Sequence, residues 1–130
     1  INPSGQVVST SYKKHKSPNE KIYVKDEYTP MTIQGVHIVA DICYDFHFQD
    51  IADRIHSEDL LIAPVDDDRF GNYMPYLHAA DIVFRAVENN VNIVTASTNG
   101  PTFFVNRRGV VMYSPLQMGK HDTLVVSVNL

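Results

Sequence analysis

The sequence predicts an α/β fold built on a mixed sheet with two main helices. Two mainly apolar runs, Val36–Ile42 and Leu60–Val65, have the length and composition of buried strands. A segment with apolar residues at helical spacing separates them, and a second helical pattern follows the second run. Because a strand, a helix and a strand in succession form a right-handed crossover, we expect the two runs to pair in parallel.

The segment before the first buried run is predicted to be partly extended. Gln6–Tyr12 is rich in residues that favour strands, and Lys21–Lys25 is compatible with a brief edge strand. Charges and prolines predict irregular structure over the rest of Lys16–Pro30. Gln34–Gly35 predicts a hairpin turn between Thr32–Ile33 and the first buried run.

Two segments have the periodicity of amphipathic helices. The first is Phe46–His56, with these apolar residues at helical spacing: Phe48, Ile51, Ala52 and Ile55. The second is about Pro75–Asn90, where we expect a polar stripe of His78, Asp81, Arg85 and Glu88. Its packed side is predicted to be Ala79, Ala80, Val83, Phe84 and Val87. We expect Arg85 and Glu88 to form a structural ion pair.

Further strands are predicted toward the C-terminus. Val91–Ser97 is expected to be a strand, and Thr102–Asn106 and Val110–Tyr113 to form a hairpin around Arg107–Gly109. Thr123–Val128 is expected to close the chain as a strand. No internal repeat or linker divides the sequence, so we expect residues 1–130 to belong to one domain.

The composition limits the classes of function. With 44% apolar and 20% charged residues, it is typical of a globular domain. A formal net charge of -4 argues against a nucleic-acid partner, because phosphate binding needs a basic surface. Both apolar runs are too short to cross a bilayer, so we expect membrane contact only through segments outside this sequence. Because the sequence begins at Ile1, we expect a processed product or part of a longer protein.

Cys43 is the only cysteine, and it stands where the first buried run gives way to the first helical pattern. Amide N–H groups at such a turn favour a thiolate, so Cys43 is a candidate nucleophile. The alternative is a small buried apolar side chain. A single cysteine also excludes an internal disulfide and a multi-cysteine zinc site.

Besides the cysteine, the sequence contains a basic run, an acidic run and several histidines. Lys13 lies in a basic run with Lys14 and Lys16, which is either a solvated surface or the source of a catalytic ammonium group. Asp66–Asp68 is predicted to be an acidic loop and not a cation site, because adjacent carboxylates point in different directions. The 6 histidines show no zinc-type spacing, so we expect no metal site.

The segments around Lys13 and Cys43 resemble motifs of the nitrilase-type carbon–nitrogen hydrolases. Tyr12–His15 with Pro18 resembles K-x-H-x-x-P, which carries the family's catalytic lysine. Ile42–Asp45 resembles the nucleophile motif, which usually reads I-C-Y-E. The distance and order of the two segments also fit the C-terminal half of this family's domain.

Three later segments continue the resemblance, which is closest to the apolipoprotein N-acyltransferases. Ala63–Gly71 resembles N-P-S-N-D-A-W-F-G. Leu77–His78 followed by Phe84–Asn89 resembles the family's Q-H and R-A-I-E-N helix, and Ser97–Gly100 resembles T-N-T-G. The resemblance therefore runs through almost the whole chain.

The resemblance implies half of an αββα sandwich and part of a Glu-Lys-Cys triad, with no cofactor and no metal ion. Cys43 would form a thioester, while Lys13 and the backbone N–H of Tyr44 would stabilise the oxyanion. Glu20 matches the second glutamate of the family. His78 and Asn99 are expected to line the substrate side of the site.

The general base of the family is a glutamate upstream of the lysine, and no acidic residue precedes Lys13 here. We therefore expect an incomplete triad in this chain. The sequence also departs from the family pattern in having Asp45 in place of a glutamate and Arg69 in place of a tryptophan. The stretch after His15 lacks the acyltransferases' apolar residues.

Three functions remain open. The first is transfer of a phospholipid acyl chain to an N-terminal amine through a thioester on Cys43, at a cell membrane with an extracytoplasmic catalytic domain. The second is a soluble, cytoplasmic nitrilase-family amidase that takes a small-molecule substrate. The third is a catalytically incomplete module that dimerises, because half of a sandwich leaves an apolar sheet face uncovered. A missing N-terminal half or a homodimer partner would cover that face.

Overall fold

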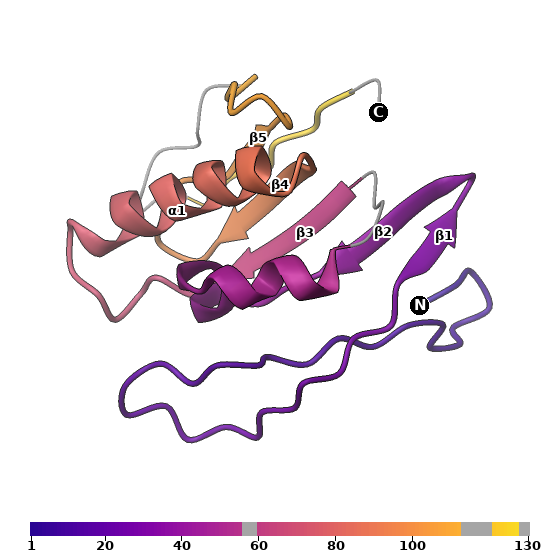
Figure 1. Ribbon diagram of the computed structural model, residues 1–130, viewed down its shortest axis with the longest axis horizontal. Helices are drawn as coiled ribbons and strands as arrows, with labels where there is room; N and C mark the ends of the chain where they lie inside the picture. Colours follow the sequence, from indigo (N-terminus) through magenta and orange to yellow (C-terminus); the bar gives the residue numbers. More distant parts are fainter. Residues whose placement is uncertain (56–59, 113–120, 128–130) are drawn as a thin grey trace.

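The computed structural model describes residues 1–55, 60–112 and 121–127 and contains a mixed sheet with the strand order β1-β2-β3-β4-β5 (Figure 1). The strands are β1 Met31–Ile33, β2 Val36–Ala40, β3 Leu60–Val65, β4 Asn92–Ser97 and β5 Phe103–Val105. One long helix, α1, covers Met74–Glu88, and two 3-10 helices, η1 and η2, cover Cys43–His47 and Gln49–Arg54. The α/β class and the mixed sheet are confirmed.

The strand directions follow from the connections between them. β2 and β3 are parallel, as predicted, and β4 is parallel to β3, while β1 and β5 pair antiparallel at the two edges. The β1–β2 turn places Gln34 at φ 51° and Gly35 at φ 86°. Two successive residues with positive φ match the right-handed twist of a tight hairpin, and glycine adopts this conformation without strain.

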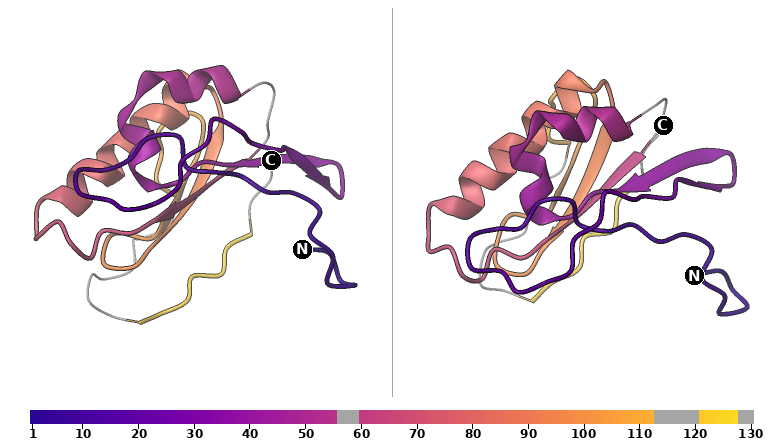
Figure 2. Two further views of the ribbon diagram at one scale, coloured as in Figure 1. Left: turned by 90° about the horizontal axis from the view of Figure 1, so that it is seen from below. Right: turned by 60° about the horizontal axis from the view of Figure 1, so that its bottom comes forward.

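The hydrophobic core lies between one face of the sheet and a layer formed by α1, η1 and η2. Figure 2 shows these helices on one side of the sheet and residues 121–127 on the other. The buried core side chains are Val39, Cys43, Phe46, Ile51, Leu61, Ala63, Val65, Ile82, Ala86, Val91, Ile93, Phe103 and Val105. Cys43 therefore belongs both to the core and to the turn that follows β2.

The helix predicted at Phe46–His56 is wrong in type. The structure has η1 and η2 there, separated by Phe48, whose backbone is extended at φ -109° and ψ 145°. This break lets the Phe48 ring stack on His15, with 4.0 Å between ring centroids. The sheet is therefore accompanied by one main helix. The last predicted helical position, 56, lies outside the described residues.

Part of the predicted polar stripe of α1 is buried, and part of its predicted packed side is exposed. His78 and Arg85 are buried, whereas the side chains of Phe84 and Val87 are 64% and 51% exposed. His78 and Arg85 donate from Nε2 and Nε to backbone carbonyl oxygens of η1, at 2.8 and 2.9 Å. These contacts satisfy polar groups that burial would otherwise leave unpaired. The expected Arg85–Glu88 ion pair is present.

Three predicted strands are wrong where the structure describes them. Residues 6–12 and 21–25 belong to an irregular N-terminal arm, residues 1–30, which Figure 1 shows as a long loop beside η1 and η2. Isolated backbone hydrogen bonds, such as Lys25 N–H to the Lys13 carbonyl at 3.0 Å, hold the arm together. Residues 123–127 join no strand, because they run apart from the sheet. Residues 113 and 128, which end two of the predicted strands, lie outside the described part of the chain.

A buried ion pair fixes η2 to the end of β2. Arg54 donates from Nη1 to Asp41 at 2.7 Å and from Nη2 to Asp26 of the arm at 2.8 Å. Burial raises the pKa of Asp41 to about 6, although Arg54 opposes this shift. Arg54 therefore joins three segments at the side of the sheet where Cys43 lies.

Candidate functional site

Cys43 is the first residue of η1 and lies three positions after the end of β2. Its φ of 53° falls in the left-handed region, which is uncommon for a residue other than glycine. Such backbone strain persists only where the surroundings hold it, and it is frequent at active sites. The thiol is buried, and Sγ lies 3.7 Å from the backbone carbonyl oxygen of Asp66, which follows β3.

Lys13 and Glu20 of the N-terminal arm form a close pair. The Lys13 side chain is buried, and its Nζ donates to the two carboxylate oxygens of Glu20 at 2.9 and 2.7 Å. The N–H and hydroxyl groups of Ser17 also donate to Glu20, both at 2.9 Å. Burial raises the pKa of Glu20, but the hydrogen bonds from Lys13 and Ser17 outweigh it and leave the pKa below its ordinary value.

Asp45 of η1 binds the arm segment that carries Lys13. Its buried carboxylate accepts the backbone N–H groups of Lys14 at 3.1 Å and His15 at 2.7 Å, and also contacts His15 Nδ1 at 3.1 Å. A carboxylate accepts several N–H groups well because it has four lone-pair sites. Asp45, two residues after Cys43, thus fixes the arm that carries Lys13 against the turn that carries the thiol.

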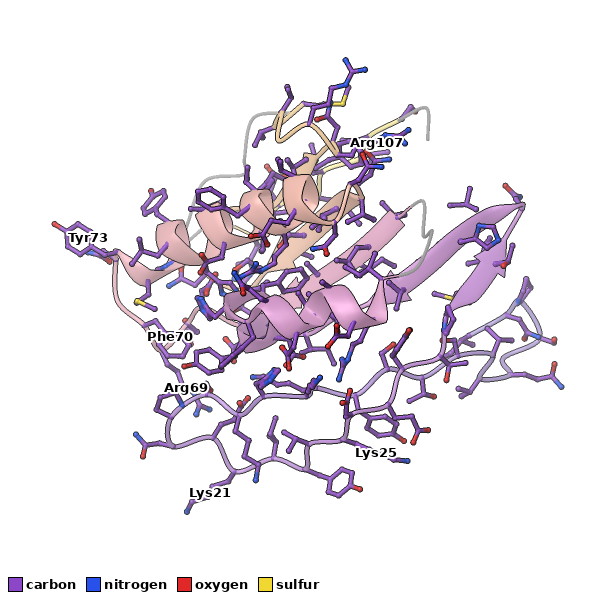
Figure 3. All side chains as sticks on the ribbon, viewed as in Figure 1. Lys21, Lys25, Arg69, Phe70, Tyr73 and Arg107 are labelled. Atoms are coloured by element: carbon purple, nitrogen blue, oxygen red, sulfur yellow. The ribbon has the colours of Figure 1, made fainter. Side chains whose placement is uncertain are left out.

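Cys43, Lys13 and Glu20 meet at open cavities. One cavity of about 430 Å³ is lined by all three side chains, together with apolar residues that include Ile22 and Ile42. A second, of about 770 Å³, shares Cys43 and Glu20 and extends toward other residues: Lys21, Asp66, Arg69 and Phe70. In Figure 3, Arg69 and Phe70 lie at the same end of the molecule as Lys21.

The thiol of Cys43 is not activated in this chain. Burial raises its pKa, and this outweighs the backbone of Asp66, the positive charge of Lys13 and the backbone N–H of Tyr44, which all lower it. The backbone N–H at the turn does favour the thiolate, as expected, but burial has the larger effect on the pKa of the thiol. A thiol in this environment needs a proton acceptor before it can attack a carbonyl carbon.

The remaining candidate residues, Tyr44, His78 and Asn99, have different surroundings. The Tyr44 ring packs on His47 and Phe48 of its own turn, at 5.0 and 5.4 Å between centroids. His78 reaches the backbone carbonyl of Cys43 from α1. Asn99 lies between β4 and β5, and it does not line either of the two cavities that contain Cys43 and Glu20.

Asp67 is a buried residue of the site that sequence reasoning missed. It lies in the acidic run after β3, and its Oδ1 is 3.0 Å from Nδ1 of His78. Its Oδ2 accepts the Ser97 hydroxyl at 2.9 Å, and its N–H donates to Thr98 Oγ1 at 3.2 Å. A Cβ on Gly100 would come within 2.2 Å of Asp67 Oδ2, so only glycine permits this approach.

A signal for Asp67 was present in the sequence. The C-terminal ends of neighbouring parallel strands meet at one edge of a sheet, where ligands usually bind. Cys43 follows β2 and Asp67 follows the adjacent strand β3, so this topology places the two residues near each other. The acidic run alone pointed to a solvated loop, which holds for Asp66 and Asp68 but not for Asp67.

No three His, Cys, Asp or Glu side chains come together as a metal site within residues 1–55, 60–112 and 121–127. Over the same residues, none of the helices has the length and apolar character needed to span a membrane.

The sequence matches no family model and no curated protein. The fold, however, is similar to solved structures. One is an amidase of the nitrilase superfamily from Nesterenkonia AN1, in a cysteine mutant, with 20% identity, a TM-score of 0.57 and coverage of 74% of this chain and 40% of the amidase. Another structure of the Nesterenkonia sp. AN1 amidase, with acrylamide added to the active-site cysteine, is 21% identical over 74% of this chain and 41% of the amidase, with a TM-score of 0.56.

A third similar structure is the glutamine-dependent NAD⁺ synthetase from Acinetobacter baumannii, solved with ADP. It is 16% identical, with a TM-score of 0.67, over 84% of this chain and 24% of the synthetase. The chain thus spans less than half the length of each of these proteins. The comparisons show that the chain shares the fold of part of each of these proteins.

Proposed function

We propose that this chain carries the nucleophile and the oxyanion-binding groups of a cysteine-dependent enzyme that cleaves carbon–nitrogen or related acyl bonds. The observation that carries the proposal is the convergence of Cys43, Lys13 and Glu20 on one cavity. The pairing of Lys13 with Glu20 keeps the ammonium group in place beside the thiol. An ammonium group fixed beside a buried thiol is suited to stabilising negative charge on a substrate oxygen.

In the proposed reaction, the Cys43 sulfur attacks the carbonyl carbon after its proton has been removed. The carbonyl oxygen takes up the negative charge and is stabilised by Lys13 Nζ and by the N–H of Tyr44. Collapse of the intermediate breaks the bond to the leaving group, an amine from an amide or an alcohol from an ester, which takes a proton, and leaves a thioester on Cys43. Water or an acceptor amine then attacks the thioester and restores the thiol.

The proton acceptor in this proposal comes from outside these 130 residues. Glu20 lines the cavity, but its carboxylate is engaged by Lys13 and Ser17. No acidic residue precedes Lys13 in the sequence. The raised pKa of Cys43 also fits a site that lacks its base. A carboxylate from another segment or from a partner subunit would complete the reaction.

The finer form of the proposal is transfer of a phospholipid acyl chain to an N-terminal amine, as in the apolipoprotein N-acyltransferases, with membrane contact through other segments. The apolar residues Ile22 and Ile42 in the wall of the cavity favour an acyl chain as ligand. Hydrolysis of a small amide is the alternative, and the fold likeness to amidases favours it. Faster acylation of Cys43 by long-chain esters than by acetyl esters would favour the first.

The test compares two reactions of Cys43 by intact-protein mass spectrometry. p-Nitrophenyl acetate acylates the thiolate through a tetrahedral oxyanion, whereas iodoacetamide alkylates it without forming one. Both rates contain the same thiolate fraction, so the ratio of acylation to alkylation reports oxyanion stabilisation. We expect this ratio to exceed that of a cysteine peptide by about tenfold or more.

The matched variants are Lys13→Met and Lys25→Met. Lys13→Met should lower the ratio of acylation to alkylation to the value of the cysteine peptide, because the ammonium group that faces the oxyanion is lost. Lys25 is an exposed lysine of the same arm that pairs with Glu27, so its substitution should leave the ratio unchanged. A wild-type ratio equal to that of the peptide, or equal losses in the two variants, would overturn the proposed function.

A further inference from the structure

We propose that His78 fixes the peptide group between Cys43 and Tyr44 and thereby directs the N–H of Tyr44 toward the oxyanion. The inference rests on the proposed function of Cys43. In it His78 is a positioning residue that does not touch the substrate. Its two ring nitrogens are already engaged by protein groups, Nε2 by the Cys43 carbonyl at 2.8 Å and Nδ1 by Asp67 at 3.0 Å.

The peptide group between Cys43 and Tyr44 has a fixed internal geometry. A trans peptide is planar, and its C=O and N–H bonds point in opposite directions. The carbonyl of Cys43 and the N–H of Tyr44 belong to the same peptide. A contact that fixes the carbonyl oxygen on α1 therefore fixes the N–H toward the opposite side. That N–H acts on the Cys43 sulfur, since it lowers the pKa of the thiol against the larger effect of burial.

This peptide group needs a contact from outside its own turn to keep its orientation. Cys43 has φ 53°, a conformation that is strained for a residue other than glycine. A peptide group can rotate as a unit when the dihedral angles on its two sides change together. The hydrogen bond from His78 opposes that rotation because it would be lost if the carbonyl turned away. The Cys43 carbonyl can only accept, so Nε2 of His78 carries the hydrogen.

The side chain of His78 is itself held in place by its neighbours. His78 and Asp67 are each 3% exposed, and Asp67 is in turn bound by Ser97 and Thr98. The ring of His47 stacks on the ring of His78, with 4.7 Å between centroids. A buried side chain with both nitrogens bonded and one face covered has a single orientation. The position of the Tyr44 N–H is thus set from β4 and α1, and not only by its own turn.

The experiment uses a matched pair of variants that share Asp67→Asn. His78→Gln retains a side-chain N–H in place of Nε2 and an oxygen that can accept from the substituted position 67. His78→Met has nearly the same shape and no donor. Both variants are neutral, so neither leaves a charged carboxylate buried without a partner. The Asp67→Asn single variant is the common reference.

The first readout is the ratio of acylation to alkylation of Cys43. We expect the His78→Gln/Asp67→Asn variant to stay within about threefold of the reference, and the His78→Met/Asp67→Asn variant to fall by about a hundredfold, as on loss of an oxyanion donor. Alkylation alone should fall much less than acylation, because it forms no oxyanion and loses only the smaller effect of the Tyr44 N–H on the pKa of the thiol. Equal ratios in the two variants, or a loss of alkylation that matches the loss of acylation, would overturn the positioning role.

The second readout does not depend on catalysis. In ¹⁵N-labelled protein, the chemical shift of the Tyr44 amide should stay at the reference value in the His78→Gln/Asp67→Asn variant and move away from it in the His78→Met/Asp67→Asn variant. An unchanged Tyr44 amide in both variants contradicts the inference. If the wild-type ratio equals that of a peptide, the proposed function fails, while the Tyr44 amide still decides whether His78 holds this peptide.

Discussion

The thiol of Cys43 combines two features that act in opposite directions. Its place at the end of a parallel strand, with Lys13 and an amide N–H beside it, suits a nucleophile. Its burial keeps the proton on the sulfur. The same burial has a use once a base is present, because charges interact more strongly where water is excluded. The resting thiol is therefore a property of the incomplete site.

The raised pKa of Cys43 predicts slow alkylation near neutral pH. Iodoacetamide reacts with the thiolate, so the rate for Cys43 should lie below that of a cysteine peptide and should rise at more alkaline pH than the peptide rate does. Lys13→Met should move the midpoint of this rise further toward alkaline pH, because the lysine charge favours the thiolate. The measurement is the alkylation rate as a function of pH.

Lys25→Met serves as the control for a lost surface charge, because Lys25 lies on the arm away from the two cavities. Its pH profile should coincide with that of the wild type. A Cys43 midpoint at or below that of the peptide, or no movement with Lys13→Met, would show that burial does not dominate the titration of the thiol.

At the scale of elements, the site depends on the docking of the N-terminal arm onto η1. Lys13 and Glu20 both belong to the arm, and the arm has only isolated backbone hydrogen bonds of its own. Asp45 supplies the connection through the N–H groups of Lys14 and His15. Arg54 adds a second connection through Asp26. Without these contacts, Lys13 would not stay beside the thiol.

Asp45→Asn should loosen the arm, because an amide replaces a carboxylate that accepts two backbone N–H groups. Hydrogen bonds to charged groups contribute about 1.5–3 kcal/mol each. We therefore expect the Lys14 and His15 amides to exchange at least about tenfold faster, at about 1.4 kcal/mol per factor of ten. The amides of β4 should keep their protection. Hydrogen–deuterium exchange with peptide resolution measures both.

Asp68→Asn is the matched control, because Asp68 is an exposed aspartate outside this contact. Exchange in the arm should not change in that variant. If Asp45→Asn leaves the Lys14 and His15 amides as protected as in the wild type, the arm is held by other contacts, and Asp45 does not position Lys13.

The strands and the main helix could be predicted because each leaves a local pattern. Apolar runs gave β2 and β3, and helical spacing gave α1. The break at Phe48 could not be predicted, since it accompanies a stack on His15, a contact with the distant arm. Periodicity also could not tell which face of α1 is covered. His78 and Arg85 face the core because carbonyl oxygens of η1 accept their hydrogens.

The candidate site was predictable where the family resemblance supplied roles, and less so where packing decides. Lys13, Glu20 and Cys43 line one cavity, while their catalytic roles stay a prediction. Burial of the thiol outweighs the effect of the amide N–H on its pKa, because desolvation depends on the whole packing around Sγ. Asp67 was missed because its neighbours Asp66 and Asp68 are exposed, and nothing in an acidic run marks its middle residue as buried.

At the scale of the whole molecule, the sheet is apolar on both faces. The face away from α1, called here the second face, carries Ala40, Ile62, Val94 and Phe104 in register across four neighbouring strands, with Pro64 opposite Ala96 in another row. Phe104 is already buried and residues 121–127 lie on this side, whereas Pro64 and Ala96 are exposed. Parallel strands with two apolar faces normally lie between two layers. We propose that a second layer covers this face, supplied by another segment of a longer protein or by a second copy of this chain.

Studied by itself, the chain should cover its second face by self-association. We expect its mass in sedimentation velocity to rise with concentration, and a hydrophobic dye to bind at low concentration, where the face is free. Ala96→Asp places a charge at an exposed position of this face and should weaken association at least about tenfold, because the charge would be buried without a partner. Ala52→Asp, at an exposed position of η2, should have no such effect. A monomer at all concentrations that binds no dye would mean that residues of this chain already cover the second face.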